Sequence, residues 1–169
     1  METQIIKINK ENLDSIEMDE AGKLIAAGEL VAFPTETVYG LGGDALDPEA
    51  AHKIYAAKGR PSDNPLIVHI AEYEDMYRVG RNIPPQAKLL ADAFWPGPLT
   101  MIVEKSDNVP YATTGGMDTV AVRMPNHPVA LALIRKSGCL IAAPSANTSG
   151  KPSPTLAKHV KHDMDGKID

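Results

Sequence analysis

The alternation of apolar and polar residues along the chain predicts strands separated by helices. Short apolar or alternating runs indicate strands, and apolar residues spaced by three and four indicate helices. The predicted strands are Gln4–Ile8, Leu30–Phe33, Leu66–Ile70, Leu99–Val103, Thr119–Arg123 and Leu140–Ala143. The predicted helices cover residues 19–27, 48–58, 84–94 and 128–137, and a further helix is expected near the run LAKHV. We find no repeat and no interior linker, so we expect one domain over residues 1–169.

The segment that follows the predicted helix 48–58 has the residues of a phosphate-binding turn. Lys58 and Arg60 lie either side of Gly59, so both cations can face one anion across the turn. Asn64 precedes Pro65, which favours extended geometry and leaves its amide free to reach a ligand. The alternative on these residues alone is a polar loop with solvated charges.

Two other loops have side chains suited to a small-molecule site. Pro34–Gly43 is rich in hydroxyls and then in glycines, which is common in the floor of a small-molecule pocket, but it is neither a Walker A loop nor a dinucleotide fingerprint. In the loop 144–155, Ser145 and Asn147 would lie on one side of an extended chain. A disordered linker is the alternative for that loop.

Two strands contain candidate ligand groups near their ends. His69 lies in an apolar strand, where a hydrogen-bonded core histidine is the more common case. Arg123 ends a strand, and strand ends are where open α/β sheets place ligand groups, although a surface arginine needs no function.

Composition narrows the class of protein. Apolar residues make up 43% and charged residues 23%, and no apolar run reaches the ~18 residues of a membrane span. The amino-terminal residues lack the apolar stretch of a secretion signal, so we expect a cytoplasmic protein. The single cysteine, Cys139, excludes an intrachain disulfide and a cysteine metal cluster.

Charge is unevenly distributed. The net charge of -5 argues against a protein that coats nucleic acid through bulk positive charge. Residues 119–162, however, contain no Asp or Glu and several Lys and Arg residues. Such a block lowers the cost of gathering phosphates locally, although helix-surface lysines can also be merely solvated.

Five segments together form a specific pattern: PTETVYGLG, KGRPSDNPLIVHI, WPGPLT, TVAVRMP and PSANTSGKPSPT. In this order they resemble the YrdC/YwlC/YciO family, whose established activity is threonylcarbamoyl-AMP synthesis. The resemblance covers about Leu30 to Thr155, and the wording of the motifs is closest to the YwlC type. The family signature is a Lys-x-Arg pair followed much later by Ser-x-Asn, here Lys58, Arg60, Ser145 and Asn147.

The resemblance implies a twisted open mixed sheet flanked by helices, with a concave basic cavity. It also implies an enzyme, a nucleotidyltransferase that makes threonylcarbamoyl-AMP and pyrophosphate from L-threonine, bicarbonate and ATP with Mg²⁺. The intermediate then passes to a partner complex that modifies tRNA. No tightly bound cofactor and no protein metal site are expected. The residues implied to bind threonine are Thr37, His69, Arg123 and Ser145. Those implied to bind ATP are Lys58, Arg60, Asn64, Thr119, Asn147 and Thr155, with Lys58 and Arg60 also stabilising charge during the reaction.

Family members continue past this point with a further strand and an Arg-Pro-Gly turn that also line the site. We therefore expect the domain to be incomplete at its carboxyl-terminal end, either as a fragment or as a short form. Two alternatives to a synthase remain: a module that binds double-stranded RNA or tRNA without chemistry, and a fragment that binds ligand without turnover. Few aromatic residues weaken the RNA alternative, since there are two Phe and one Trp.

Overall fold

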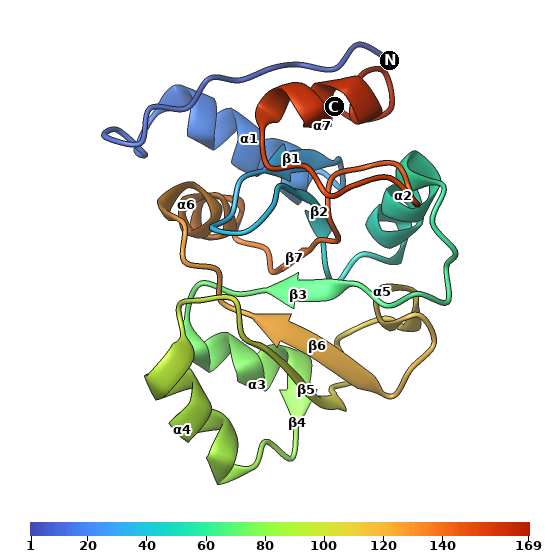
Figure 1. Ribbon diagram of the computed structural model, residues 1–169. Coiled ribbons are helices and arrows are strands. Elements are labelled where there is room, and N and C mark those ends of the chain that lie inside the picture. Colours follow the sequence, from blue (N-terminus) through green and yellow to red (C-terminus); the bar gives the residue numbers. More distant parts are fainter.

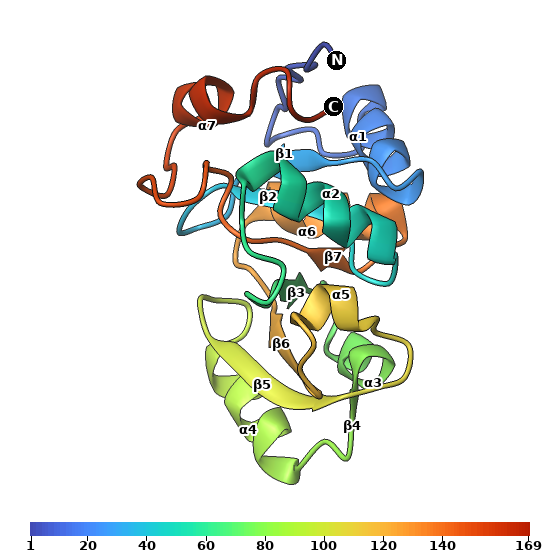
Figure 2. The same cartoon turned by 90° about the vertical axis from the view of Figure 1, so that its right-hand side faces the viewer.

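The computed structural model describes residues 1–169 and contains one seven-stranded mixed sheet with helices on both faces (Figures 1 and 2). The spatial strand order is β1-β2-β7-β3-β6-β5-β4. Strands β3 and β6 are parallel, and every other neighbouring pair is antiparallel. The strands are β1 Val31–Phe33, β2 Gly40–Asp44, β3 Ile67–His69, β4 Gly80–Arg81, β5 Thr100–Lys105, β6 Thr119–Arg123 and β7 Ile141–Ala142. The predicted α/β class with an open mixed sheet is confirmed.

Helices α2 (Pro48–Lys58) and α6 (Pro128–Ser137) begin and end at residues that cap them. In α2, the Asp47 side chain accepts a hydrogen bond from the Glu49 amide, and Gly59 closes the helix with a left-handed φ of 61°. In α6, His127 caps the first turn and Gly138 takes the corresponding left-handed position. The helices are α1 Ile16–Ala26, α2 Pro48–Lys58, η1 Tyr73–Asp75 (a 3-10 turn), α3 Met76–Val79, α4 Pro85–Phe94, α5 Tyr111–Thr114, α6 Pro128–Ser137 and α7 Ala157–Met164. None of them is long and apolar enough to cross a membrane.

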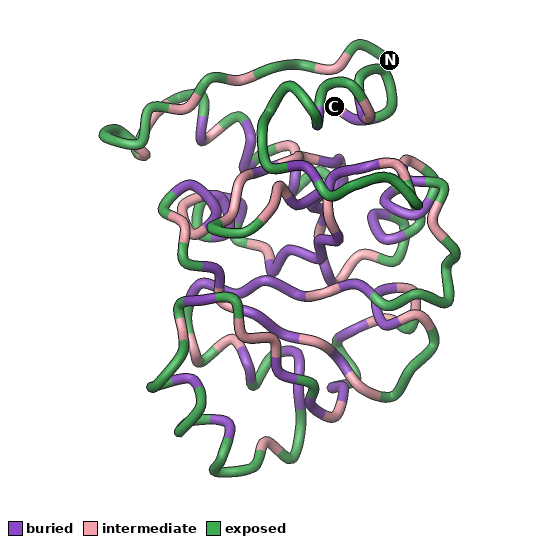
Figure 3. Tube along the Cα trace, viewed as in Figure 1, coloured by how far each residue is buried: buried purple, intermediate pink, exposed green.

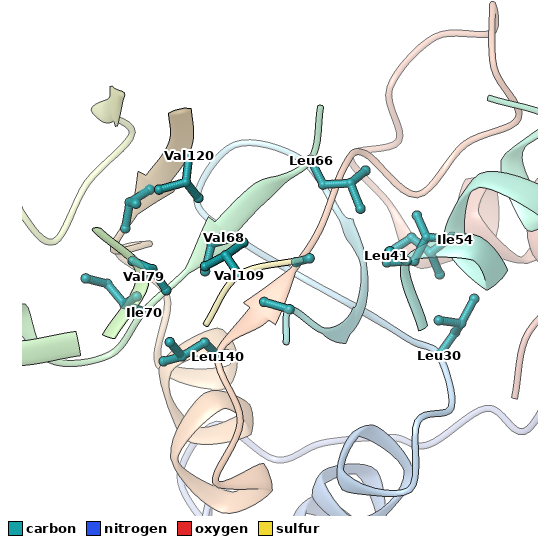
Figure 4. Close-up of a cluster of buried hydrophobic side chains, with 14 of the residues drawn as sticks. Leu30, Leu41, Ile54, Leu66, Val68, Ile70, Val79, Val109, Val120 and Leu140 are labelled. Atoms are coloured by element: carbon teal, nitrogen blue, oxygen red, sulfur yellow. The ribbon is translucent and has the colours of Figure 1, made fainter. Parts of the chain in front are cut away.

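The core lies on both sides of the sheet, because neighbouring residues of a strand point to opposite faces. On one face, Val68, Val120 and other buried aliphatic side chains pack beneath α2 and α3 (Figure 4). On the other, Phe33 and Ile141 pack against α1 and α6. Figure 3 shows that the buried stretches run through the middle of the molecule, along the central strands.

The face covered by α1 and α6 is left partly open over β3, β6 and β5. Ile67 and Ala121 are register partners on this face and are only half-buried. Ile102 on β5 pairs with Ala121 on β6, and Ile102 is 71% exposed. This part of the sheet therefore forms an uncovered floor beside the helices.

Two expectations about the amino-terminal half are wrong. The segment Gln4–Ile8 is not a strand but an extended arm. The backbone N–H of Gln4 donates to the Asp169 carbonyl rather than to a neighbouring strand. Its alternation reflects Ile6 and Ile8 packing on the α1 and α6 side of the core.

The glycines of Pro34–Gly43 also behave differently from the expected loop, since Gly40 to Gly43 belong to strand β2. A side chain at Gly42 would lie 2.7 Å from both Phe33 and Ile141. Glycine is therefore needed at position 42 for close packing against Phe33 and Ile141, and the role of this segment in a small-molecule pocket stays a prediction.

Candidate functional site

The carboxyl ends of the two parallel strands bring His69 and Arg123 side by side. They are register partners on β3 and β6, so their side chains leave the same face of the sheet. His69 is 3% exposed and Arg123 is 8% exposed. Ligands of open α/β sheets bind at the carboxyl ends of strands, and this pair occupies such a position.

The Arg123 guanidinium is held by three neighbours. Its Nε donates to the Gly97 carbonyl at 3.2 Å, one terminal nitrogen donates to Thr37 Oγ1 at 3.3 Å, and the other pairs with the Glu36 carboxylate. The second Glu36 oxygen accepts a hydrogen bond from the backbone N–H of Asn126 at 2.5 Å. Thr37 and Arg123, which were predicted to share a ligand, are thus in direct contact. Glu36, to which no sequence pattern assigned a role, contacts Arg123 beside them.

His69 is enclosed by apolar and backbone groups. Its Nδ1 lies 3.1 Å from the Ile67 carbonyl, and its ring meets Phe33 edge to face with centroids 5.9 Å apart. Burial lowers the pKa of His69 to about 4, although the carbonyls of Ile67 and Ile141 partly oppose that shift. The imidazole is therefore neutral at pH 7. The geometry has the features of a core histidine, and the contact with threonine stays a prediction.

Lys58 fastens the loop 144–155 to the end of α2. Its ammonium donates to the carbonyl of Ser145 at 2.5 Å and to that of Asn147 at 2.6 Å, and the side chain is buried, with the residue 2% exposed. The Lys58 carbonyl in turn accepts from the Ser149 amide at 2.8 Å. Burial, and then the charge of Arg60, lower the pKa of Lys58 to about 8, so the ammonium is mostly protonated at neutral pH.

Ser145 and Asn147 are positioned by this clamp. Ser145 forms an isolated bridge with Gly40 beside the start of β2. The side-chain nitrogen of Asn147, Nδ2, donates to the carbonyls of Thr148 and Lys151, at 2.8 and 2.9 Å. The side-chain oxygen, Oδ1, is buried without a hydrogen-bond partner. The loop is therefore an ordered part of the fold rather than a linker.

Arg60 turns away from the Lys58 clamp. Its Nε donates to the Asn64 carbonyl at 3.4 Å and a terminal nitrogen donates to the Pro65 carbonyl at 3.1 Å. The Asn64 side chain and most of the turn are exposed. Burial lowers the pKa of Arg60 and of Arg123, but a guanidinium stays charged at neutral pH. The two cations thus bind different segments, and their joint grip on one anion stays a prediction.

The remaining two predicted residues lie apart from Arg123. Thr119 is at the amino end of β6, and extending the β3–β6 register by two residues places it beside Pro65, next to the Arg60 turn. Thr155 is exposed in the segment before α7, which the bond from the Tyr39 amide to the Pro154 carbonyl holds near the loop of Thr37.

Glu36 is the site residue that sequence reasoning missed. It stands directly before Thr37, but an acid in a loop gives no spacing signal, and its partners are 87 and 90 residues away. No group of three or more His, Cys, Asp or Glu side chains lies close enough to hold a metal ion. A cavity of about 510 Å³ between the amino-terminal arm, α1, β1 and α7 contains none of the predicted site residues.

The fold is that of an open α/β protein with a mixed sheet, and a polar cluster of Glu36, Thr37, His69 and Arg123 lies at the carboxyl ends of its two parallel strands. The chain belongs to the Sua5/YciO/YrdC family, whose family model, described as "Telomere recombination", matches residues 23–169. The resemblance drawn from the five segments is therefore confirmed.

Individual relatives agree with this membership. The threonylcarbamoyl-AMP synthase of Pyrococcus abyssi is 56% identical over 167 residues, which are 99% of this chain and 49% of that protein. The threonylcarbamoyl-AMP synthase of Bacillus subtilis is 59% identical over 150 residues, 88% of this chain and 43% of that protein. The chain thus spans about half the length of these relatives.

Solved structures show the same architecture. The structure of P. abyssi Sua5 complexed with L-threonine matches with a TM-score of 0.90 at 55% identity, covering 96% of this chain and 46% of the other. Escherichia coli YciO matches with a TM-score of 0.81 at 19% identity, covering 96% and 77%, which shows the shared fold alone.

Proposed function

We propose that this chain carries out the threonylcarbamoyl-AMP synthase reaction, forming threonylcarbamoyl-AMP and pyrophosphate from L-threonine, bicarbonate and ATP. The observation that carries the proposal is the Thr37–Arg123 contact beside His69 at the carboxyl ends of β3 and β6. It occurs in a chain 56% identical to a named synthase and 55% identical to a Sua5 structure with L-threonine. These comparisons favour a synthase over an RNA-binding module.

The Arg123 pocket suits the amino acid. A planar guanidinium can hold a carboxylate through two parallel hydrogen bonds, and its burial strengthens them by excluding water. Thr37 offers a hydroxyl next to that guanidinium, and buried, neutral His69 lies beside it as the register partner of Arg123. A site that hydrogen-bonds the threonine hydroxyl would reject an amino acid lacking it, because its own polar groups would be left unpaired.

The Arg60 turn and the loop fastened by Lys58 suit the nucleotide. Half-buried Arg60 and exposed Asn64 lie in the turn next to Thr119, and Asn147 lies in the loop that Lys58 holds. Because no cluster of metal-ligating side chains is present, the residues fit a Mg²⁺ ion that arrives on the ATP phosphates rather than one held by a protein cage. When bound, that ion would neutralise phosphate charge.

The reaction needs positioning and charge stabilisation rather than a protein nucleophile. The threonine amine condenses with bicarbonate, losing water, and a carbamate oxygen attacks the α-phosphorus while pyrophosphate leaves. Arg60 would stabilise the negative charge that develops on the phosphate oxygens, and the buried Lys58 ammonium would add to this stabilisation. The product would pass to a downstream complex that transfers the threonylcarbamoyl group to tRNA.

Pyrophosphate release tests this proposal. The purified chain is incubated with ATP and Mg²⁺, with and without L-threonine and bicarbonate, and the adenylate product is identified by mass spectrometry. We expect release that needs both co-substrates and that collapses in Arg60→Ala. A folded sample that releases no pyrophosphate would overturn the proposal for this chain.

A further inference from the structure

The Glu36 carboxylate occupies the position on Arg123 where a substrate carboxylate would bind. One Glu36 oxygen pairs with a terminal nitrogen of the guanidinium, and the other accepts from the Asn126 amide. The remaining Arg123 bonds go to neutral groups, the Gly97 carbonyl and the Thr37 hydroxyl. Glu36 is therefore the one anion that balances this buried cation.

A second carboxylate cannot bind the Arg123 guanidinium beside Glu36 without a cost in binding free energy. Arg123 has five N–H groups, and its Nε, one N–H toward Thr37 and one toward Glu36 are already engaged. The Arg123 side chain is only 10% exposed, so little open space surrounds the remaining donors. A ligand carboxylate beside Glu36 would also face like-charge repulsion in a poorly solvated site.

Glu36 is placed on a segment that is able to yield. Glu36 and Thr37 are exposed as residues and lie in bends between β1 and β2 rather than in a helix or strand. The Thr35 hydroxyl organises the turn locally, accepting from the Thr37 amide at 3.2 Å and donating to the Val38 carbonyl at 2.6 Å. Rotation of the Glu36 side chain therefore breaks only its two bonds, to Arg123 and to the Asn126 amide.

We propose that Glu36 is an internal ligand of Arg123, which an incoming amino acid displaces with its own carboxylate. The inference rests on the proposed function, since it assigns Arg123 to the amino-acid carboxylate. Without the amino acid, the Arg123 guanidinium stays charge-balanced by Glu36, and the apparent affinity for the amino acid is reduced by the fraction of molecules in which Glu36 holds the guanidinium. Glu36 is thus a residue that sets affinity and favours ligands that have a carboxylate.

Calorimetric titration of Glu36→Gln with L-threonine tests this directly. Because the neutral amide competes poorly for a guanidinium, we expect the dissociation constant to fall by roughly tenfold relative to the unmodified chain. L-Threoninamide, which lacks the carboxylate, should gain nothing from the substitution. Glu72→Gln is the matched control, because Glu72 pairs with Arg135 on the exposed surface. An unchanged or weaker affinity for L-threonine in a folded Glu36→Gln chain would overturn the proposal.

A second measurement keeps this inference separate from the proposed function. Acetate is titrated into ¹⁵N-labelled protein while the Arg123 Nε–H resonance, assigned through its loss in Arg123→Lys, is followed. If Glu36 is an internal ligand, the resonance shifts at much lower acetate in Glu36→Gln than in the unmodified chain, whether or not threonine binds. Equal acetate dependence in the two proteins would overturn the internal-ligand proposal. Acetate competition without any threonine binding would support it while overturning the proposed function.

Discussion

The two ends of the parallel pair β3 and β6 differ in how deeply their polar side chains are buried and in how many other segments hold those side chains. At the carboxyl end, His69 and Arg123 are buried, and Arg123 is held by two separate segments, through Gly97 and through the adjacent Glu36 and Thr37. At the amino end, Arg60 and Asn64 lie in an exposed turn and bond mainly within it. Because ordering groups on binding costs affinity, we expect the first end, already ordered around Arg123, to accept a small ligand once Glu36 is displaced, and the second to depend on its ligand for order.

The two cations of the Lys-x-Arg pair also differ in their surroundings. Lys58 is a buried clamp that joins α2 to the loop of Ser145 and Asn147, whereas Arg60 is half-buried and donates to the Asn64 and Pro65 carbonyls of its own turn. Lys58 thus links the loop 144–155 to α2, and Arg60 is the cation that we propose for contact with the nucleotide.

The largest effect is expected at the buried end. Arg123→Ala removes the only cation of the amino-acid pocket and leaves Glu36 without its partner, so we expect a loss of about 4 kcal/mol in L-threonine binding. Calorimetric titration measures it, with Arg135→Ala as the control because its ion pair with Glu72 is exposed. Retention of near-normal affinity in Arg123→Ala would show that the carboxylate binds elsewhere.

The clamp is expected to matter mainly for stability. Lys58→Met leaves two carbonyls, those of Ser145 and Asn147, without their donor and should lower the free energy of unfolding by about 3 kcal/mol. Lys53→Met on the same helix is the control, since Lys53 makes an exposed pair with Glu29 and should cost under ~1 kcal/mol. Urea unfolding of both variants measures the difference. Similar costs for the two lysines would refute the clamp.

The buried histidine predicts a pH effect. The pKa of His69 is about 4 in the folded chain, below its ordinary value of 6.5, so the unfolded chain binds the proton more readily between these values. Stability is thus fully present above pH 6.5 and falls as the pH drops toward 4, by on the order of 2 kcal/mol at pH 4.5. Urea unfolding at pH 7 and pH 4.5 measures this, and His69→Gln should flatten the dependence. An equally steep fall in that variant would contradict the assignment.

The smallest effect on the fold is expected at the exposed end. Arg60→Ala should weaken ATP binding about tenfold, as expected for one charge-assisted hydrogen bond. Its free energy of unfolding should stay within ~0.5 kcal/mol of the unmodified chain, because its bonds are local and exposed. Nucleotide titration and urea unfolding give the two numbers, and Arg81→Ala, which disrupts the exposed pair with Glu104, is the control. A large loss of stability in Arg60→Ala would remove the distinction between the two ends.

Local sequence signals predicted most of the elements. The bounds of α2, β6 and α6 agree with the expected residues because caps and alternation act within a few residues. The helix α3, the strand β4 and the helix α5 were not predicted, since segments of two to four residues carry no measurable period.

The site could be predicted only as residue types. Motifs named Thr37, Lys58 and Arg123, but the Thr37–Arg123 bond and the Lys58 clamp join residues 86 to 89 positions apart. Glu36 could not be found, because a carboxylate becomes informative only once a buried cation is known to face it. His69, which sequence alone favoured as a core residue, is packed as such.

Titration of the chain with L-threonine in the absence of nucleotide tests most directly whether the amino-acid pocket is built before ATP arrives. We predict binding without nucleotide and an unchanged dissociation constant in Arg60→Ala. Absence of binding until a nonhydrolysable ATP analogue is added, or an equal loss of affinity in Arg60→Ala and Arg123→Ala, would contradict the division of the site into a preorganised end and a ligand-ordered end.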